Sequence, residues 1–170
     1  MVADFGFVHL STGDLLRKEV ESKGPQAEKI EEVLKDGGLV SSEMLVELIK
    51  GAFQKNGMQG KFLLDGFPRS QQNVDAWNEI IKDSINVPCL LYFSCSEETM
   101  KNRLLKRAET SGRSDDNEET IMKRFHTFQS ETQPILQQFR DMNKVQEISA
   151  EGEVDEVYNN VKQSIQVYFP

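Results

Sequence analysis

The segment that decides the fold is Phe62-Leu63-Leu64-Asp65-Gly66-Phe67-Pro68-Arg69. Its apolar start, Lys61 to Leu64, predicts a strand, and a helix is predicted to follow from Gln71. Asp65 therefore lies at the carboxyl end of a strand, where open α/β sheets bind ligands, and could organise a hydrated magnesium ion. Gly66 lets a ligand approach the backbone, Pro68 stiffens the turn, and Arg69 can fork onto phosphate oxygens. A plain strand-to-helix turn does not require this combination, which therefore favours a functional site.

Strands and helices alternate along the whole chain of 170 residues. This order predicts an α/β fold, formed by a single domain over residues 1–170 with a mainly parallel sheet. The run from Pro88 to Ser94 is continuously apolar, which predicts a strand buried on both faces. Pro134 is expected to bend or divide the helix that begins near Glu118. The predicted strands are 5–10, 61–64, 88–94 and 145–149, and the predicted helices include 26–36, 71–83, 97–108 and 154–167.

Composition and charge exclude several classes of protein. The chain has 20 basic and 28 acidic side chains, a net charge of −8, which argues against a nonspecific DNA clamp or a polybasic membrane anchor. It has no apolar stretch near the roughly 20 residues that a membrane helix needs. Cys89 and Cys95 fall in or beside one predicted strand, where they cannot bridge. A reducing compartment fits best, so we expect a cytoplasmic protein, with the nucleus also open.

A second candidate segment is Ser11-Thr12-Gly13-Asp14-Leu15-Leu16-Arg17, a strand end that leads into a helix. The Ser-x-x-Asp pattern is typical of a helix start, and the free backbone amides with Arg17 one turn later could hold an anion. The simpler interpretation, a helix cap with a surface arginine, is favoured for this segment taken alone.

Four arginines form a third candidate set. Arg103 and Arg107 share one helix face, Arg113 lies in a Gly- and Asp-rich loop, and Arg124 is on the next helix. A solvated face would interleave more acids with these bases, so the set suggests a polyphosphate site.

The loop Ser111-Gly112-Arg113-Ser114-Asp115-Asp116-Asn117 is the fourth candidate. Its two aspartates, Asp115 and Asp116, could pair with the arginines when the loop closes. Asp116 with Glu119 also forms a simple capping box, and both interpretations stand together. The two histidines, His9 and His126, are isolated from other ligand types, so neither a zinc site nor a Ser-His-Asp arrangement is expected.

Taken together, these motifs resemble the nucleoside monophosphate (NMP) kinase family, specifically the short-lid branch of eukaryotic UMP-CMP kinases and cytosolic adenylate kinases. The resemblance covers essentially the whole chain, and several motifs occur in register. It implies transfer of the γ-phosphoryl group of ATP to a nucleoside monophosphate, with Mg2+ accompanying the ATP. The segments that carry it are 7–17, 38–40, 65–69, 111–117 and 150–152.

The resemblance also implies roles for individual residues. The catalytic residues would be Arg69, Arg107, Arg113, Arg124 and Asp65, with no direct metal ligand and Asp65 acting through water. ATP would be bound by Arg103, Arg107 and Gly152. An NMP-binding region would span about 11–40, and a lid with Asp115 and Asp116 about 106–116. The NMP-binding residues would be Thr12, Arg17, Gly38, Leu39, Val40, Gly66, Phe67, Pro68, Arg69, Asn73, Arg113 and Arg124.

The preferred base is a choice between UMP or CMP and AMP. Asn73 stands where this branch has Asn in UMP-CMP kinases and Gln in adenylate kinases. The pair Trp77-Asn78 and the segment 111–114 also favour a pyrimidine. Thr12 favours AMP, because many UMP-CMP kinases have Ala there. The pyrimidine interpretation is preferred, with adenylate kinase as the alternative.

One departure from the family pattern concerns the P-loop. The family begins with a strand, a loop of the form G-x-x-x-x-G-K-[ST] and a helix, and Val2 to Gly6 resembles the end of that helix. The Gly60-Lys61 pair is followed by Phe62 and has Lys55 where the first Gly should stand. The resemblance therefore implies that the central P-loop strand, between the strands ending at Asp65 and near Ser94, is absent from this chain.

Three explanations for that departure are open: the working protein is longer, a second chain or protein partner supplies the strand, or the chain is a catalytically inactive, kinase-derived component of a larger assembly. A regulator that binds a monophosphate without catalysis is a further alternative. ATP and a nucleoside monophosphate are the expected partners, with no nucleic acid and no membrane.

Overall fold

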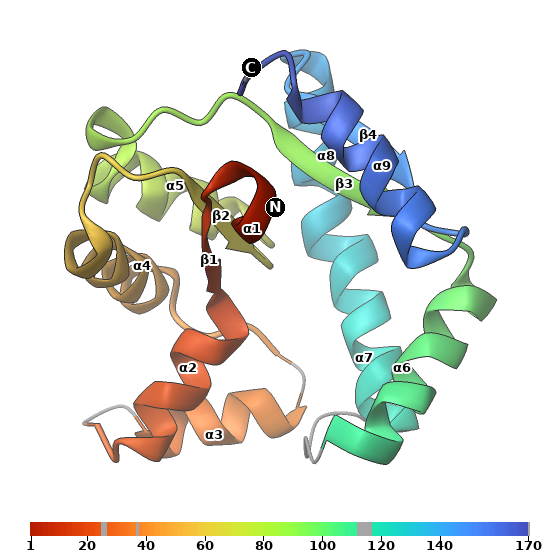
Figure 1. The fold of residues 1–170 in the computed structure, drawn as a ribbon. Helices are drawn as coiled ribbons and strands as arrows, with labels where there is room; N and C mark the ends of the chain where they lie inside the picture. The colour runs from red at the N-terminus through yellow and green to blue at the C-terminus, as the bar shows by residue number, and fades with distance from the viewer. Residues whose placement is uncertain (25–26, 37, 112–116, 170) are drawn as a thin grey trace.

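The computed structural model describes residues 1–24, 27–36, 38–111 and 117–169. Within these ranges, helices surround two short parallel sheets (Figure 1). The chain is an α/β protein with the parallel strands that the alternating pattern predicts. None of the helices in the described ranges is long and apolar enough to cross a membrane.

Each sheet is a pair of parallel strands. Strand β1 (Val8–Ser11) pairs with β2 (Phe62–Asp65), and its last residue Ser11 lies opposite Asp65. Strand β3 (Leu90–Ser94) pairs with β4 (Val145–Ser149), from Leu90 opposite Val145 to Ser94 opposite Ser149. In each sheet the carboxyl ends of the two strands therefore lie together, and the loops that follow them meet at one edge.

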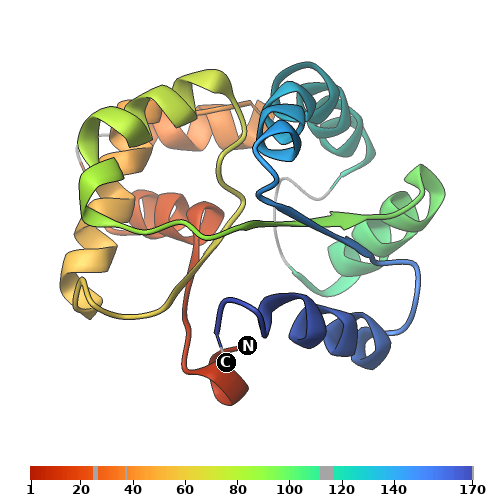
Figure 2. The same cartoon turned by 90° about the horizontal axis from the view of Figure 1, so that it is seen from above.

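The helices form two groups, one beside each sheet (Figures 1 and 2). Helices α2 to α5 lie beside β1 and β2, and helices α6 to α9 lie beside β3 and β4. The predicted division near Pro134 is confirmed, since a π-helical turn, η2 (Phe128–Thr132), precedes the helix that contains this proline. The helices are α1 (Val2–Phe5), α2 (Thr12–Glu21), α3 (Ala27–Asp36), α4 (Ser42–Asn56), α5 (Gln71–Ile80), the 3-10 turn η1 (Lys82–Ser84), α6 (Glu97–Ser111), α7 (Glu118–Thr127), α8 (Gln133–Asp141) and α9 (Val154–Ile165).

Two apolar clusters hold these groups together. The larger one centres on α4, whose Val46, Ile49 and Phe53 are at most 1% exposed, and it continues into α2, α3 and α5. The smaller one packs Phe7 and Ile148 against Val161 and Ile165 of α9. Leu63 of β2 and Leu91 of β3 also pack on this smaller cluster, so α9 connects the two sheets.

The prediction that the strand near Pro88 to Ser94 is buried on both faces is wrong for the described residues. Phe93 is 48% exposed, and the other residues of β3 are only partly buried. The reason is that β3 pairs with β4 alone, while β2 and β3 both line a cavity of about 2080 Å³. The absence of a central P-loop strand from the chain stays a prediction.

Candidate active site

The first element of the site is the start of α2. The Ser11 hydroxyl accepts a hydrogen bond from the Asp14 backbone N–H (3.3 Å), which confirms the predicted helix start. The next residue, Thr12, is 3% exposed, and its hydroxyl lies within hydrogen-bond distance of the backbone carbonyls of Asp65 (3.1 Å) and Gly66 (3.2 Å). Thr12 therefore fastens the end of β1 to the end of β2. Arg17, one turn into the helix, pairs with Asp14.

The second element is the turn that follows β2. Gly66 has φ +78°, and a Cβ atom there would lie 2.6 Å from Nη2 of Arg69. Arg69 Nε donates to the Gly66 carbonyl (2.7 Å), and the Arg69 backbone N–H donates to Asn73 Oδ1 (3.0 Å). The Thr132 hydroxyl of η2 donates to the Arg69 carbonyl (2.7 Å). Three separate segments thus fix both the backbone and the guanidinium of Arg69.

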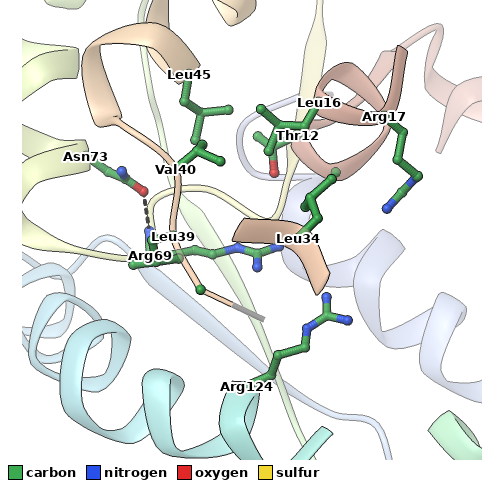
Figure 3. A pocket seen from close by; sticks show the side chains of 12 residues that line it. Thr12, Leu16, Arg17, Leu34, Leu39, Val40, Leu45, Arg69, Asn73 and Arg124 are labelled. Carbon is green, nitrogen blue, oxygen red and sulfur yellow. Dashed lines mark hydrogen bonds between the residues drawn. The ribbon is translucent and has the colours of Figure 1, made fainter. Parts of the chain in front are cut away.

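The structure brings many of the predicted NMP-binding residues into one pocket (Figure 3). In this view the guanidinium groups of Arg17, Arg69 and Arg124 face a common space between α2, α3 and α7. The described residues that line the pocket include these three arginines and no carboxylate, although the chain carries a net charge of −8. The predicted residues in this pocket are Thr12, Arg17, Gly38, Leu39, Val40, Arg69, Asn73 and Arg124.

Other predicted site residues line the large cavity between the sheets. Gly66, Phe67 and Pro68 lie along it, and the Phe67 ring also packs on Trp77, with ring centroids 5.4 Å apart. Asp65, Arg103 and Gly152 line it as well. Leu39, Arg69 and Arg124 line both spaces, so the pocket and the large cavity adjoin at these two arginines. A group bound in the pocket would thus face the cavity across two guanidinium groups.

A few predicted residues lie elsewhere. Arg107, on α6, lines neither the pocket nor the cavity. Arg113, Asp115 and Asp116 lie outside the described residues, as does the rest of the predicted lid from residue 112 to 116. The part of the lid from residue 106 to 111 is the last portion of α6.

Arg103 and Gly152 meet at the carboxyl ends of β3 and β4. The Arg103 guanidinium donates to the carbonyls of Ala150, Glu151 (3.3 Å) and Gly152 (3.1 Å). The Glu151 carboxylate in turn accepts hydrogen bonds from the Thr99 hydroxyl (2.7 Å) and the Ser96 N–H. These two bonds, with the nearby Arg103 charge, lower the pKa of Glu151. The network fixes the start of α6 against the turn between β4 and α9.

Asp65 stands at the carboxyl end of β2, beside the large cavity. Its carboxylate is 63% exposed and lies 3.6 Å from Nε2 of His9, which also lines the large cavity. In the described part of the chain, no group of three or more His, Cys, Asp or Glu side chains is placed to hold a metal ion directly. An exposed carboxylate at a strand end is suited to a hydrated cation held through its water shell.

Sequence reasoning missed Leu34 and Leu45, which line the apolar part of the pocket wall. Gly13 and Leu16 also line the pocket, and both belong to the candidate segment from Ser11 to Arg17, although neither was given a role of its own. Leu45 follows the helical periodicity of a core residue, so no signal distinguishes it. Ser42 was also missed: it contacts Asn73 although the two residues are 31 positions apart.

Strand ends that meet at one edge and a pocket lined by arginines are the arrangement that α/β proteins use to bind phosphorylated small molecules. The family model for adenylate kinase matches residues 1–144. The chain is 40% identical to the UMP-CMP kinase of Gallus gallus over 168 residues, 96% of this chain and 86% of that protein. It is 42% identical to adenylate kinase 1 of Schistosoma mansoni over 169 residues, 99% of this chain and 84% of that protein.

A third relative is UMP-CMP kinase 3 of Oryza sativa subsp. japonica, 43% identical over 162 residues, 95% of this chain and 75% of that protein. The chain belongs to the adenylate kinase family, as its motifs predicted, and it is a phosphotransferase of the nucleoside monophosphate kinase type. The comparisons give no support to the alternative of a catalytically inactive assembly component.

Proposed function

We propose that the protein transfers the γ-phosphoryl group of ATP to UMP or CMP, giving a nucleoside diphosphate and ADP. The observation that carries this proposal is the convergence of Arg17, Arg69 and Arg124 on one pocket that adjoins a second, larger cavity. The monophosphate would occupy the pocket, with its phosphate near the arginines. Its acceptor oxygen would then face the cavity, from which the γ-phosphoryl group would arrive.

Phosphoryl transfer suits this arrangement because its transition state spreads negative charge over several oxygens and requires little covalent chemistry from the protein. Catalysis then depends on positioning and on fixed positive charge. Arg69 and Arg124, which line both spaces, would lie beside the transferred group, and Arg17 would hold the far side of the monophosphate. Thr12, Leu39 and Val40 would close the pocket around the nucleoside.

We propose that ATP binds on the side of the large cavity. Arg103 and Gly152 would lie beside its base, since the guanidinium is held against the Gly152 carbonyl at that edge. Enzymes of this family use ATP with a divalent metal, generally Mg2+, which neutralises charge on the phosphate oxygens. Asp65 fits this role through the waters of the ion, because its carboxylate is exposed at the edge of the cavity. Arg107, Arg113, Asp115 and Asp116 would complete the site on the lid side.

The choice of UMP or CMP rests on Asn73 and on the relatives named as UMP-CMP kinases. The alternative, AMP, is favoured by Thr12 and by the relative named as adenylate kinase 1. Activity on UMP or CMP would place the protein in pyrimidine nucleotide metabolism. We also propose a cytoplasmic location, because Cys89 and Cys95 are both free.

The test is an ADP-release assay on the natural polypeptide that contains these 170 residues. UMP, CMP and AMP are each varied at saturating ATP and Mg2+. We expect kcat/KM for UMP and CMP to exceed that for AMP. A higher value for AMP would replace the proposal with the adenylate kinase alternative, and no turnover with any of the three would overturn it.

A further inference from the structure

The carboxamide of Asn73 is buried in the wall of the pocket, and each of its polar atoms has a partner in the chain. Asn73 is 2% exposed; its Oδ1 accepts from the Arg69 backbone N–H (3.0 Å), and its Nδ2 donates to the Ser42 hydroxyl oxygen (2.8 Å). Ser42 is 7% exposed and is the first residue of α4. Unlike Asn73, it does not line the pocket.

These two hydrogen bonds fix the direction of the amide group. A backbone N–H can only donate, so it requires the oxygen of the carboxamide, and the NH2 group must then face Ser42. Rotation by 180° would place the NH2 group against the Arg69 N–H and would lose that bond, although the Ser42 hydroxyl could then donate to the carboxamide oxygen. A carboxamide has two N–H donors and an oxygen with two lone pairs. One donor and one lone pair are therefore left for a ligand, in a fixed order.

We propose that Ser42 is a positioning residue for recognition of the base. Its hydroxyl holds the carboxamide of Asn73 so that the remaining donor and acceptor meet the hydrogen-bonding edge of the bound base. This inference rests on the proposed function, since it requires a nucleoside monophosphate in the pocket. Sites that read hydrogen-bonding groups discriminate strongly, because a mismatch leaves buried polar groups unpaired.

The phosphate end of the site shares the bond between Asn73 and the Arg69 N–H but is also held by contacts that do not involve Ser42. The guanidinium of Arg69 is fixed through Nε by the Gly66 carbonyl (2.7 Å), and the Arg69 carbonyl is held by Thr132 (2.7 Å). Arg17 and Arg124 come from α2 and α7, which do not contact Ser42 by any hydrogen bond among those described. Loss of the Ser42 hydroxyl should therefore weaken recognition of the base and leave recognition of the phosphate intact.

The test compares Ser42→Ala with Ser42→Thr, which keeps the hydroxyl, in the natural polypeptide. We expect Ser42→Ala to raise KM for UMP and CMP roughly 5- to 30-fold, as expected for one buried hydrogen bond. The KM for ATP and the inhibition constant of ribose 5-phosphate, which has the phosphate but no base, should change less than about 2-fold, within the scatter of a neutral change. Ser42→Thr should restore most of the loss. Ser41→Ala is the control, since Ser41 is exposed and its hydroxyl donates to Glu43.

A second measurement reports on the amide itself. The side-chain N–H proton that Asn73 donates to Ser42 should be protected from solvent exchange in the unmodified protein and lose that protection in Ser42→Ala. If Ser42→Ala does not fold, Ser42→Cys replaces it, because the thiol fills the space of the hydroxyl but is only a weak acceptor.

Three results would overturn the inference: an unchanged KM for UMP and CMP, an equal change in the inhibition constant of ribose 5-phosphate, or unchanged protection of the Asn73 side chain. Absence of turnover with UMP, CMP and AMP in the unmodified protein would instead overturn the proposed function. The protection experiment would still decide whether Ser42 holds the carboxamide.

Discussion

Replacement of Gly66 by Ala tests how the turn after β2 positions Arg69. Gly66 has φ +78°, a conformation that costs an L-residue about 1–2 kcal/mol. A Cβ atom would also lie 2.6 Å from Arg69 Nη2 and 3.0 Å from Thr12 Oγ1. Something must move, and the guanidinium is the flexible partner because the Thr12 hydroxyl is buried and bonded to two carbonyls.

The size of the effect follows from these terms. Displacement of the guanidinium breaks the Nε bond to the Gly66 carbonyl, and the crowding around Thr12 adds overpacking of about 1–3 kcal/mol. With the backbone term, we expect the free energy of unfolding to fall by about 2–5 kcal/mol. A misplaced Arg69 would lose a charge-assisted bond to the phosphate, which should raise KM for the monophosphate by roughly 10- to 100-fold.

The assay combines urea unfolding with steady-state kinetics, and two other glycines serve as matched controls. Gly6 has φ +68°, and a Cβ atom there would meet nothing within 4 Å, so Gly6→Ala isolates the backbone cost of about 1–2 kcal/mol. Gly51 lies in the interior of α4 with open space around it, so Gly51→Ala should stabilise the protein by about 0.5–1 kcal/mol. Neither control should change KM for the monophosphate.

The reasoning fails if Gly66→Ala destabilises the protein no more than Gly6→Ala does and leaves KM for the monophosphate unchanged. That result would mean that the close approach to Arg69 and Thr12 carries no energetic weight. A loss of stability with an unchanged KM would refute the functional half alone, since Arg69 would then not require this turn to reach the phosphate.

Three further predictions concern other parts of the molecule. Arg124→Lys keeps the positive charge but loses the planar guanidinium, so we expect kcat to fall by about 10²-fold. Arg140→Lys is the control and should leave kcat within about 2-fold, because Arg140 pairs with Glu147 and lies outside the pocket. Ile49→Ala should lower the free energy of unfolding by about 2–5 kcal/mol in urea titrations, because Ile49 is fully buried in the α4 cluster. Burial raises the pKa of the Cys89 thiol, so Cys89 should react with a thiol reagent at pH 8 more slowly than the exposed Cys95. Mass spectrometry of the modified peptides would measure the two rates, and equal rates would contradict the prediction.

Local signals in the sequence predicted the local structure well. The Ser11-x-x-Asp14 pattern marks the start of α2, because the cap depends only on atoms within one helical turn. The strand from Val145 to Ser149 has the predicted bounds. The predicted capping box of Asp116 with Glu119 is wrong by one residue: the N-cap of α7 is Asn117, whose side chain accepts from the Thr120 N–H (2.9 Å).

The burial of β3 could not be predicted from its sequence. A continuous apolar run indicates that both faces of a strand avoid water, but it does not identify the neighbour that covers each face. In the described residues β3 has one paired neighbour, β4, and its Phe93 remains 48% exposed beside the large cavity. Long-range pairing decides burial, and no local pattern contains it.

The site likewise contains residues that the sequence could predict and residues that it could not. Arg17, Arg69 and Asn73 stand in motifs with recognisable spacing, and the structure brings all three to one pocket. Leu34 and Ser42 do not stand in such motifs. The periodicity of an ordinary amphipathic helix accounts for Leu34, and a helix start accounts for Ser42, so neither residue points to a ligand. Only the fold places them next to Arg17 and Asn73.

Arg17 and Arg69 differ in where they lie relative to the two spaces of the site. Arg69 lines both the pocket and the large cavity, whereas Arg17 lines the pocket alone. The transferred group would lie where the two spaces adjoin, and fixed positive charge stabilises the transition state most where the negative charge develops. We therefore expect Arg69 to contribute more than Arg17 to catalysis, and Ala substitutions at the two positions, compared by kcat/KM, would measure the difference.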